Sequence, residues 1–351
     1  MIKIPGPPCS EKTDVIDCLN FIRIIAAVQV VFGHTVEHLK LPIDPTIFHA
    51  TYFLRGVPIF FAISGYLMWF SIGRQKSYKQ YLEKRFWRIY PELWGAVAIE
   101  VLVMALLYRE WDWFSLILFT FGQSTLFQFW TPSCLRGYGV GVPNGALWTI
   151  GVIIQYYIVA WFFYKVMSAK RNWKKWVIGF ILAFLVSFGL DYIIHLLTKN
   201  VIIGKLYSQT IIKYFWLFYI GMFIAEFKEK ILPFLKQYWS AGLLIAFVFF
   251  WSRIDLYSGY YAGWSVFLVA GLIGFAYRYP KFNVNPDVSY GLFLYHMIVV
   301  NVLVNFNMTG EWLYFLLVFG FSLLLAYIST VTIGRLSQTK KKMVADRYEE
   351  K

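Results

Sequence analysis

The sequence predicts an all-α, polytopic integral membrane protein with about ten transmembrane helices and with both termini in the cytoplasm. Three observations predict this class: the composition, the long apolar windows, and the distribution of basic residues. Of the 351 residues, 59% are hydrophobic, 21% are aromatic and only 15% are charged, and the mean hydropathy is +0.57. A soluble domain is about half apolar and a quarter charged. The composition therefore excludes a chain of soluble domains and a disordered chain.

Long apolar windows recur along the whole chain. A helix that crosses a bilayer needs about 20 mostly apolar residues. Ten windows bounded by charges, Gly or Pro meet this requirement, near residues 18–39, 52–72, 88–108, 147–167, 176–196, 210–227, 239–252, 260–277, 287–306 and 312–334. The stretch 113–130 is also apolar, but a span there would place the following basic segment on the wrong side. We therefore interpret it as an interfacial or re-entrant segment.

The net charge of +14 follows the predicted topology. With the N-terminus inside, 24 of the 33 Lys and Arg residues fall on the cytoplasmic side and eight on the outer side, with Arg23 inside the first window. This bias over short loops indicates cytoplasmic termini, and it leaves no basic patch for a nucleic acid. The predicted organisation is a cytoplasmic segment 1–17, a transmembrane domain 18–334 and a basic cytoplasmic tail 335–351.

Two ionisable residues lie inside the first window, where each costs at least about 2.5 to 3.5 kcal/mol. Arg23 and His34 are eleven residues apart, so a helix places them on one face about 16 Å apart. An arginine near the inner end could hold an anionic head group while a long arm runs along the helix toward a basic histidine. Alternatively, Arg23 snorkels to the interface and His34 hydrogen bonds a neighbouring helix.

Two further polar residues follow His34 within one turn. Glu37 and His38 stand at i+3 and i+4, close enough to touch its ring. A carboxylate there could fix the imidazole tautomer and raise its basicity, as in general-base catalysis. Alternatively, both residues lie at the outer interface as ordinary flanking polar residues.

Arg85 and Arg88 lie one turn apart at the inner end of the third window. Their guanidinium groups are suited to gripping phosphates through forked hydrogen bonds. The positive-inside rule also places basic residues here, and Glu92, four residues after Arg88, could pair with it.

The small residues and the cysteines do not indicate a catalytic or metal site. The Ser64-Gly65 pair predicts close helix packing, and the glycine-rich segment 136–145 predicts a flexible connection. Three cysteines without C-x-x-C spacing give no disulfide framework. No group of His, Cys or carboxylates has metal-ligand spacing, so the sequence predicts no metal site.

Five segments, taken in chain order, match motifs of the membrane-embedded acyltransferase 3 family. They are LNFIRIIAAVQVVFGH, with ten residues between its Arg and His, FFAISGYL at 60–67, RFWRIYP at 85–91, LWTIGVIIQYY at 147–157 and SYGLFLYH at 289–296. Each motif alone is weak, whereas the ordered set resembles this family from about residue 17 to 335. The sequence departs from the pattern at Ile153, where the family frequently has Glu.

The resemblance implies an O-acyltransferase that moves an acyl group, most often acetyl, from acyl-CoA to a hydroxyl of a surface or exported carbohydrate. The acceptor would be a polysaccharide or a lipid-linked sugar. His34 would be the catalytic residue, either as a general base or as a transiently acylated group. Arg23, Arg85 and Arg88 would lie at the acyl-CoA end. Because Ile153 stands where the family frequently has Glu, either Glu37 substitutes for that Glu or the geometry of the acceptor differs.

The resemblance also implies acetyl-CoA as the donor and a multi-pass location among the lipids of the inner or plasma membrane, while residue spacing predicts no metal and the charge distribution predicts no nucleic-acid partner. Two other classes remain. A transporter or flippase for a lipid-linked or sugar substrate would also show intramembrane Arg, His and Glu, although the sequence shows no inverted repeat. A catalytically inactive scaffold is the third class, and Ile153 is the feature that suggests it.

Overall fold

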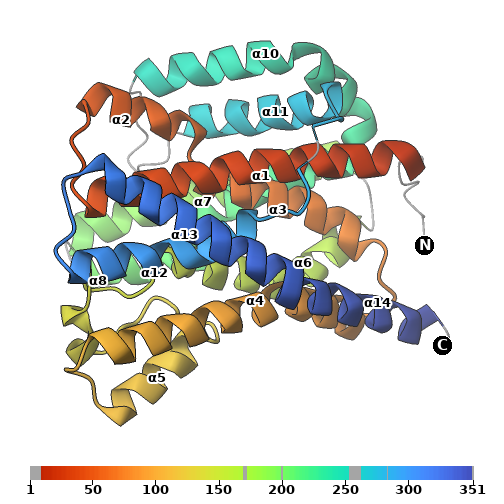
Figure 1. Cartoon of the computed structure of the whole chain (residues 1–351). Coiled ribbons are helices and arrows are strands. Elements are labelled where there is room, and N and C mark those ends of the chain that lie inside the picture. The colour runs from red at the N-terminus through yellow and green to blue at the C-terminus, as the bar shows by residue number, and fades with distance from the viewer. Residues whose placement is uncertain (1–8, 169–171, 199–200, 253–261, 283, 350–351) are drawn as a thin grey trace. The chain divides into compact units, whose positions relative to one another are not determined.

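The computed structural model describes residues 9–168, 172–198, 201–252, 262–282 and 284–349, with side chains given for these except at 9–17, 198, 201 and 349 (Figure 1). Every regular element in this part of the chain is a helix, which confirms the all-α class. Part of the predicted segment 1–17 lies outside the described residues.

Seven of the helical segments are long and apolar enough to cross a membrane: Cys18–His38, Pro45–Ile72, Tyr78–Leu107, Gly145–Ser168, Trp173–Leu197, Lys228–Ser252 and Trp312–Tyr348. Each of the ten predicted windows coincides with a helix. Three of those helices are shorter, at 16 or 17 residues, namely α9 (Ile211–Glu226), α11 (Ala262–Arg278) and α12 (Ser289–Asn305). The chain is thus built as a membrane protein, while the total of ten spans and the side of each terminus stay predictions.

The chain divides into two compact units whose segments alternate along the sequence. The first unit comprises Met1–Arg23, Gly56–Tyr78 and Val152–Val284, and the second comprises Ile24–Arg55, Lys79–Gly151 and Asn285–Lys351. The division cuts α1 (Cys9–His38) and α6 (Trp148–Ser168), and it separates the first residue of α4 (Tyr78–Leu107) from the rest of that helix.

The first unit holds most of the chain's middle helices. Besides α9, α11 and most of α6, it contains α3 (Gly56–Ile72), α7 (Trp173–Thr198), α8 (Val201–Ser208) and α10 (Lys228–Ser252). Helix α9 packs against α3 and α7, while α10 and α11 run side by side (Figure 1).

Two glycines set the contact between α3 and α9. A Cβ atom on Gly65 of α3 would overlap the carbonyl oxygen of Phe218, and one on Gly221 of α9 would overlap that of Ala62. Only glycine allows backbones to approach this closely, the usual reason for small residues between membrane helices. The predicted packing role of Gly65 is therefore confirmed.

The second unit holds the chain's last helices and the glycine-rich loop 136–145. Besides α12 and residues 24–38 of α1, it contains α2 (Pro45–Thr51), η1 (Tyr52–Leu54), α4 (Tyr78–Leu107) from Lys79 onward, α5 (Trp113–Gln123), α13 (Trp312–Ser329), η4 (Thr330–Gly334) and α14 (Arg335–Glu349). Helix α12 packs against α13. Helix α13 continues through the π-helical turn η4 into α14.

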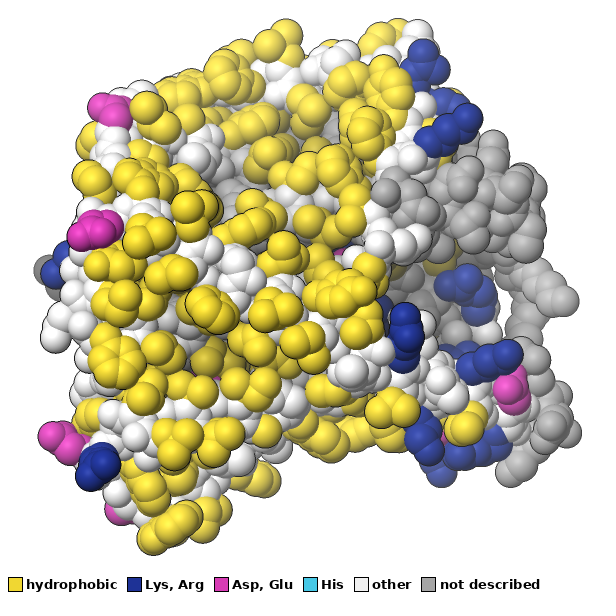
Figure 2. Space-filling view, viewed as in Figure 1, with side chains coloured by type: hydrophobic (Ala, Val, Ile, Leu, Met, Phe, Trp, Pro, Cys, Tyr) yellow, Lys and Arg dark blue, Asp and Glu magenta, His cyan; other side chains and the backbone are white. Residues whose placement is uncertain are grey.

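Polarity changes sharply along this last helical run. Large hydrophobic side chains of α13 are exposed, among them Leu316, Phe321 and Leu324, whereas Lys340 and Lys342 are exposed on α14. Figure 2 shows hydrophobic side chains over α13 and Lys and Arg side chains gathered over α14. An exposed apolar face is expected where a helix meets lipid, and a basic end where it meets the membrane surface.

Helix α5 is too short to cross a bilayer. Its 11 residues rise about 16 Å, roughly half the thickness of the hydrocarbon core. Asp112 caps its N-terminus by accepting a hydrogen bond from the Ser115 N–H at 2.9 Å, which lowers the pKa of that carboxyl. Phe119 packs with Met104 of α4 in a buried cluster, so α5 folds back against α4 as a short hairpin partner.

The loop before α6 is pinned to α12. The side-chain oxygen of Asn301 accepts a hydrogen bond from the Val140 N–H at 2.8 Å, and its amide nitrogen donates to the Pro143 carbonyl at 2.7 Å. Asn144 in turn donates to the Leu294 carbonyl at 2.9 Å. The glycine content of 136–145 predicts a flexible connection, but these bonds hold its backbone against the helix.

Candidate active site

His34 forms a hydrogen bond with a second histidine of the same unit. Its Nδ1 lies 2.8 Å from Nε2 of His296 on α12. The two rings are stacked, with centroids 5.1 Å apart and an interplanar angle of 18°. The side chain of His296 is fully buried, whereas His34 is only half-buried. A buried histidine thus supports a more accessible one, an arrangement suited to proton transfer at the accessible ring.

Local sequence explains why His296 points where it does. Nδ1 of His296 lies 3.1 Å from the carbonyl oxygen of Leu292, one turn earlier in α12. Gly291 lets α12 approach α13 closely, because a Cβ there would meet the Cα of Ala326 at 2.7 Å. The helix is therefore held on one side by α13 and on another by the loop 136–145, which fixes the position of the histidine.

Other polar groups lie near His34. The ring of His38 lies 5.8 Å away between centroids, and Arg55 is close enough to interact with His34 electrostatically. Arg55 also lies over the ring of Tyr52 at 5.4 Å. A polar neighbourhood built from α1, η1 and the following residue thus faces the histidine.

Glu37, predicted to assist His34, is exposed on α1. It interacts electrostatically with Tyr52 and His38. The hydrogen-bond partner that the structure gives to Nδ1 of His34 is His296 instead. The role of Glu37 in catalysis stays a prediction.

Arg88 forms an ion pair with Asp287, which precedes α12. The guanidinium Nη2 lies 3.7 Å from Oδ2 of Asp287, and the side chains are 40% and 16% exposed. Oδ1 of Asp287 accepts hydrogen bonds from the N–H of Ser289 at 3.1 Å and from its hydroxyl at 2.6 Å. One face of the guanidinium is therefore anchored, while much of its surface remains open to a ligand.

Arg85 lies one turn before Arg88 and over the ring of Tyr81, 5.7 Å from its centroid. Lys341 of α14 interacts electrostatically with Arg85, Arg88 and Glu92. Three cations from two helices thus gather with two carboxylates, those of Asp287 and Glu92. The balance favours an anion such as a phosphate.

Helix α14 docks onto α4 in a way that explains the place of Lys341. The hydroxyl of Ser337 donates to the Trp87 carbonyl oxygen, and Nη1 of Arg347 lies 3.9 Å from Oε2 of Glu83. Lys341 follows Ser337 by one turn, so it shares the face that meets α4.

Arg23, the third arginine of the predicted donor site, is on helix α1. It belongs to the first unit, whereas His34, Arg85 and Arg88 belong to the second. Arg23 is half-buried on α1, and its place at a donor site with the other two arginines stays a prediction.

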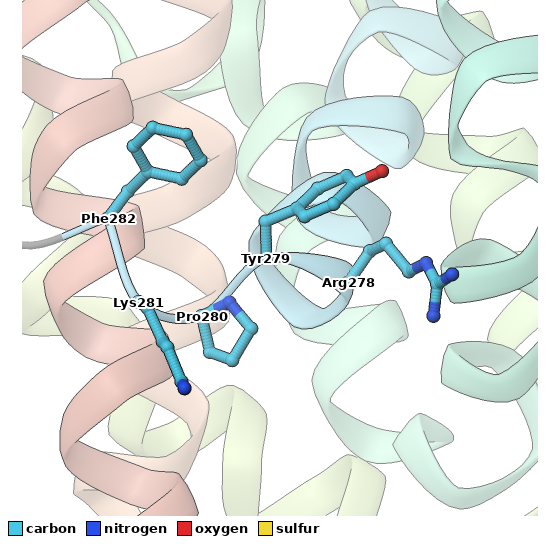
Figure 3. A pocket seen from close by; sticks show the side chains of 5 residues that line it. All are labelled: Arg278, Tyr279, Pro280, Lys281 and Phe282. Atoms are coloured by element: carbon cyan, nitrogen blue, oxygen red, sulfur yellow. The ribbon is translucent and has the colours of Figure 1, made fainter.

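The first unit has a shallow pocket directly after α11, with a volume of about 330 Å³, lined by Arg278, Tyr279, Pro280, Lys281 and Phe282 (Figure 3). The labelled side chains of Arg278 and Lys281 point in different directions in this view. Phe282 stacks on Phe21 of α1 at 5.3 Å between centroids. The pocket is an open recess beside a stacked aromatic pair, without polar groups that converge. In the described part of the chain, no group of three His, Cys, Asp or Glu side chains could hold a metal ion.

Sequence reasoning identified His34, Arg85 and Arg88 but missed three residues that contact or approach them. His296 is 262 positions from His34 in the sequence, and Asp287 is about 200 positions from Arg88. The only indication in the sequence is that His296 ends the motif SYGLFLYH. Lys341 was counted among the basic residues of the tail, and nothing in the KKK run distinguishes it from its neighbours.

Comparison with known proteins shows which family the chain belongs to. Residues 16–331 match the family model for the acyltransferase 3 group, described as an acyltransferase domain. The chain belongs to this family, and with its apolar helices it is a membrane acyltransferase.

Among curated proteins, the chain is similar to Nodulation protein 10 of Rhizobium leguminosarum bv. viciae. The two are 26% identical over 336 residues, which cover 88% of this chain and 89% of that protein. No solved structure matches the chain.

Proposed function

We propose that this membrane acyltransferase is an O-acetyltransferase, which moves acetyl from acetyl-CoA to a hydroxyl of a surface or exported carbohydrate. The proposal includes a location in the plasma or inner membrane. The observation that carries it is the hydrogen bond between His34 and His296, because it supports a half-buried imidazole at the polar end of α1. The carbohydrate class of the acceptor and the acetyl group rest on the family resemblance.

In this mechanism, His34 acts as the general base. It removes the proton from the acceptor hydroxyl while the oxygen attacks the thioester carbonyl, forming the new C–O bond. The C–S bond then breaks, and the imidazolium returns its proton to the departing CoA thiolate. Base assistance of this kind contributes roughly 100- to 10,000-fold in rate.

Arg85, Arg88 and Lys341 supply the cations for the donor's phosphates. An Arg guanidinium binds phosphate oxygens in pairs through its fork of N–H donors. Asp287 holds Arg88 from one side, which limits the rotamer entropy lost when a phosphate binds. Arg23 is proposed as a further member of the donor site.

The test uses the purified protein in lipid nanodiscs with radiolabelled acetyl-CoA and a panel of surface polysaccharides and lipid-linked sugars. We expect labelled glycan with the natural protein and a loss of roughly 100-fold or more with His34→Ala. Lys76→Ala is the matched control, since Lys76 is an exposed basic residue that lies outside the proposed site. Mass spectrometry of the product then identifies the acyl group and the hydroxyl.

Three results would contradict the proposal or a part of it. Undiminished transfer by His34→Ala would show that His34 is not the general base. Covalently labelled His34 in the absence of acceptor would replace base catalysis with a route through an acyl-histidine. Transport of a lipid-linked sugar across vesicles without any acetyl transfer would favour the flippase.

A further inference from the structure

The ring of His296 uses both nitrogens within the fold. Nδ1 contacts the Leu292 carbonyl oxygen at 3.1 Å, and Nε2 contacts Nδ1 of His34 at 2.8 Å. Its side chain has no exposed surface. His296 therefore meets substrate at neither nitrogen, and any influence it has on the reaction passes through His34.

The Leu292 contact decides where the protons lie. A carbonyl oxygen only accepts hydrogen bonds, so Nδ1 of His296 must carry a proton. In a neutral imidazole the other nitrogen then has a free lone pair and accepts. Nδ1 of His34 must therefore donate to Nε2 of His296, which leaves the lone pair of His34 on its Nε2.

We propose that His296 is a positioning residue, which holds His34 in the Nδ1–H tautomer and aims its Nε2 lone pair at the acceptor hydroxyl. The proposal rests on the function proposed above, in which His34 is the general base. It adds a second residue to that chemistry, and it specifies which nitrogen of His34 reacts.

The arrangement also suits the charged state that follows proton transfer. Once Nε2 of His34 has taken the acceptor's proton, its Nδ1–H still donates to His296, and the hydrogen bond becomes charge-assisted and stronger. His296 keeps its own proton on Nδ1 throughout. The proton on Nε2 of His34 therefore leaves only toward the CoA thiolate, and no net proton is gained or lost.

A packing role for His296 makes different predictions, and three substitutions separate the two. His296→Leu fills the same space with an apolar side chain of similar size but removes the acceptor. His296→Gln offers an amide oxygen that accepts from Nδ1 of His34. His296→Glu offers a carboxylate, which stabilises the imidazolium form of His34.

Expected results follow from the positioning role. His296→Leu lowers kcat at least about 10-fold, within the range that a base contributes, and leaves KM for acetyl-CoA unchanged because His296 lies away from the donor cations. His296→Gln recovers most of the lost kcat. Met297→Leu, a buried neighbour on α12 with a volume-conserving change, keeps the activity of the natural protein.

The pH profile provides a readout that packing alone would not move. The groups facing His34 are His296 from α12, His38 from α1 and Arg55 after η1. His296→Glu adds a negative charge to this set, so the acidic limb of kcat/KM against pH shifts to higher pH. In His296→Gln the limb stays close to its original position.

The tautomer can be observed without activity. Solid-state NMR of ¹⁵N-histidine-labelled protein in bilayers should show His34 as the neutral Nδ1–H form, assigned by the signal lost in His34→Gln. In His296→Leu that signal should divide between tautomers. A His34 signal in the Nε2–H form in the natural protein would overturn the proposal.

Kinetic outcomes also distinguish the two proposals. Full activity in His296→Leu, together with an inactive His34→Ala, overturns the positioning role and leaves the base role standing. Equal loss in His296→Leu and His296→Gln, with both variants monodisperse and melting like the natural protein, overturns the positioning role as well. Full activity in His34→Ala overturns the proposed function itself.

Discussion

The side-chain oxygen of Asn301 lies 2.8 Å from the main-chain nitrogen of Val140 and accepts its hydrogen bond. This contact attaches the loop 136–145 to α12, the helix that also carries His296. Asn301 is fully buried and satisfies donors and acceptors of three loop residues, Val140, Val142 and Pro143.

Replacing Asn301 with Leu should destabilise the protein. The change leaves the Val140 N–H and the Pro143 carbonyl without their partner, and each unsatisfied buried group costs about 1 to 3 kcal/mol. We expect a melting temperature lower by several degrees and faster proteolysis within 136–145. An unchanged melting temperature would mean that the loop has other sufficient anchors.

Replacing Gly139 with Ala should destabilise more than replacing Gly310 with Ala. Both glycines have positive φ, +57° and +86°, which costs a non-glycine residue roughly 1 to 2 kcal/mol. A Cβ on Gly139 would also overlap the side chain of Asn301, whereas one on Gly310 meets nothing within 4 Å. The difference between the two melting temperatures measures the clash, and equal values would contradict the close approach of the loop.

Replacing Gly65 with Ala should loosen the contact between α3 and α9. The added methyl overlaps the Phe218 carbonyl, so the helices must separate and lose packing along their length, at a cost of about 1 to 3 kcal/mol for overpacking. Gly189→Ala is the control, because a Cβ at that helical position meets nothing within 4 Å. Thermal unfolding in nanodiscs should show a lower midpoint for Gly65→Ala alone.

Arg88→Ala should raise KM for acetyl-CoA while kcat changes little. A lost hydrogen bond to a charged group costs roughly 1.5 to 3 kcal/mol, or about 10- to 150-fold. Arg88→Lys should recover only part of this, since an ammonium lacks the planar fork. Acetyl-dephospho-CoA lacks one phosphate of the donor. If the natural protein and Arg88→Ala have the same KM for this analogue, the phosphate that it lacks is the one that Arg88 contacts. Unchanged KM in Arg88→Ala would remove it from the donor site.

Lys341→Ala should weaken donor binding, whereas Lys340→Ala and Lys342→Ala should not. Lys341 lies near Arg85 and Arg88, while Lys340 and Lys342 are exposed on other faces of α14. Steady-state KM for acetyl-CoA at low and high salt tests this, because screening reduces a surface charge effect. A similar rise in KM for all three single variants would point to general electrostatic attraction instead.

Much of the fold was predictable because lipid imposes long apolar helices. All ten predicted windows coincide with helices, and the short α5 was predicted not to cross. The reason is local: each signal depends on about 20 consecutive residues, and those residues are exposed to the same apolar surroundings.

The site was predictable only where its residues share a helix. His34, Arg85 and Arg88 were found by helical spacing and motif, but the partner of His34 depends on how α12 packs, which no local pattern records. Spacing favoured Glu37 as the partner because it follows one turn later, yet its side chain is exposed and His296 makes the bond. The glycine content of the loop 136–145 likewise predicts flexibility, because Asn301, whose hydrogen bonds hold the loop, lies about 160 residues away.

The alternation of the two units has a consequence for how the protein is made. His34 and His296 are separated by 262 positions, and at about 5 to 20 residues per second the ribosome needs roughly 13 to 52 s to travel from one to the other. During that time His34 has no hydrogen bond to His296, because α12 has not yet been synthesised. The hydrogen bond between His34 and His296 is therefore among the last contacts that the nascent chain can complete, and a ribosome that stops before α12 releases a chain that cannot form it.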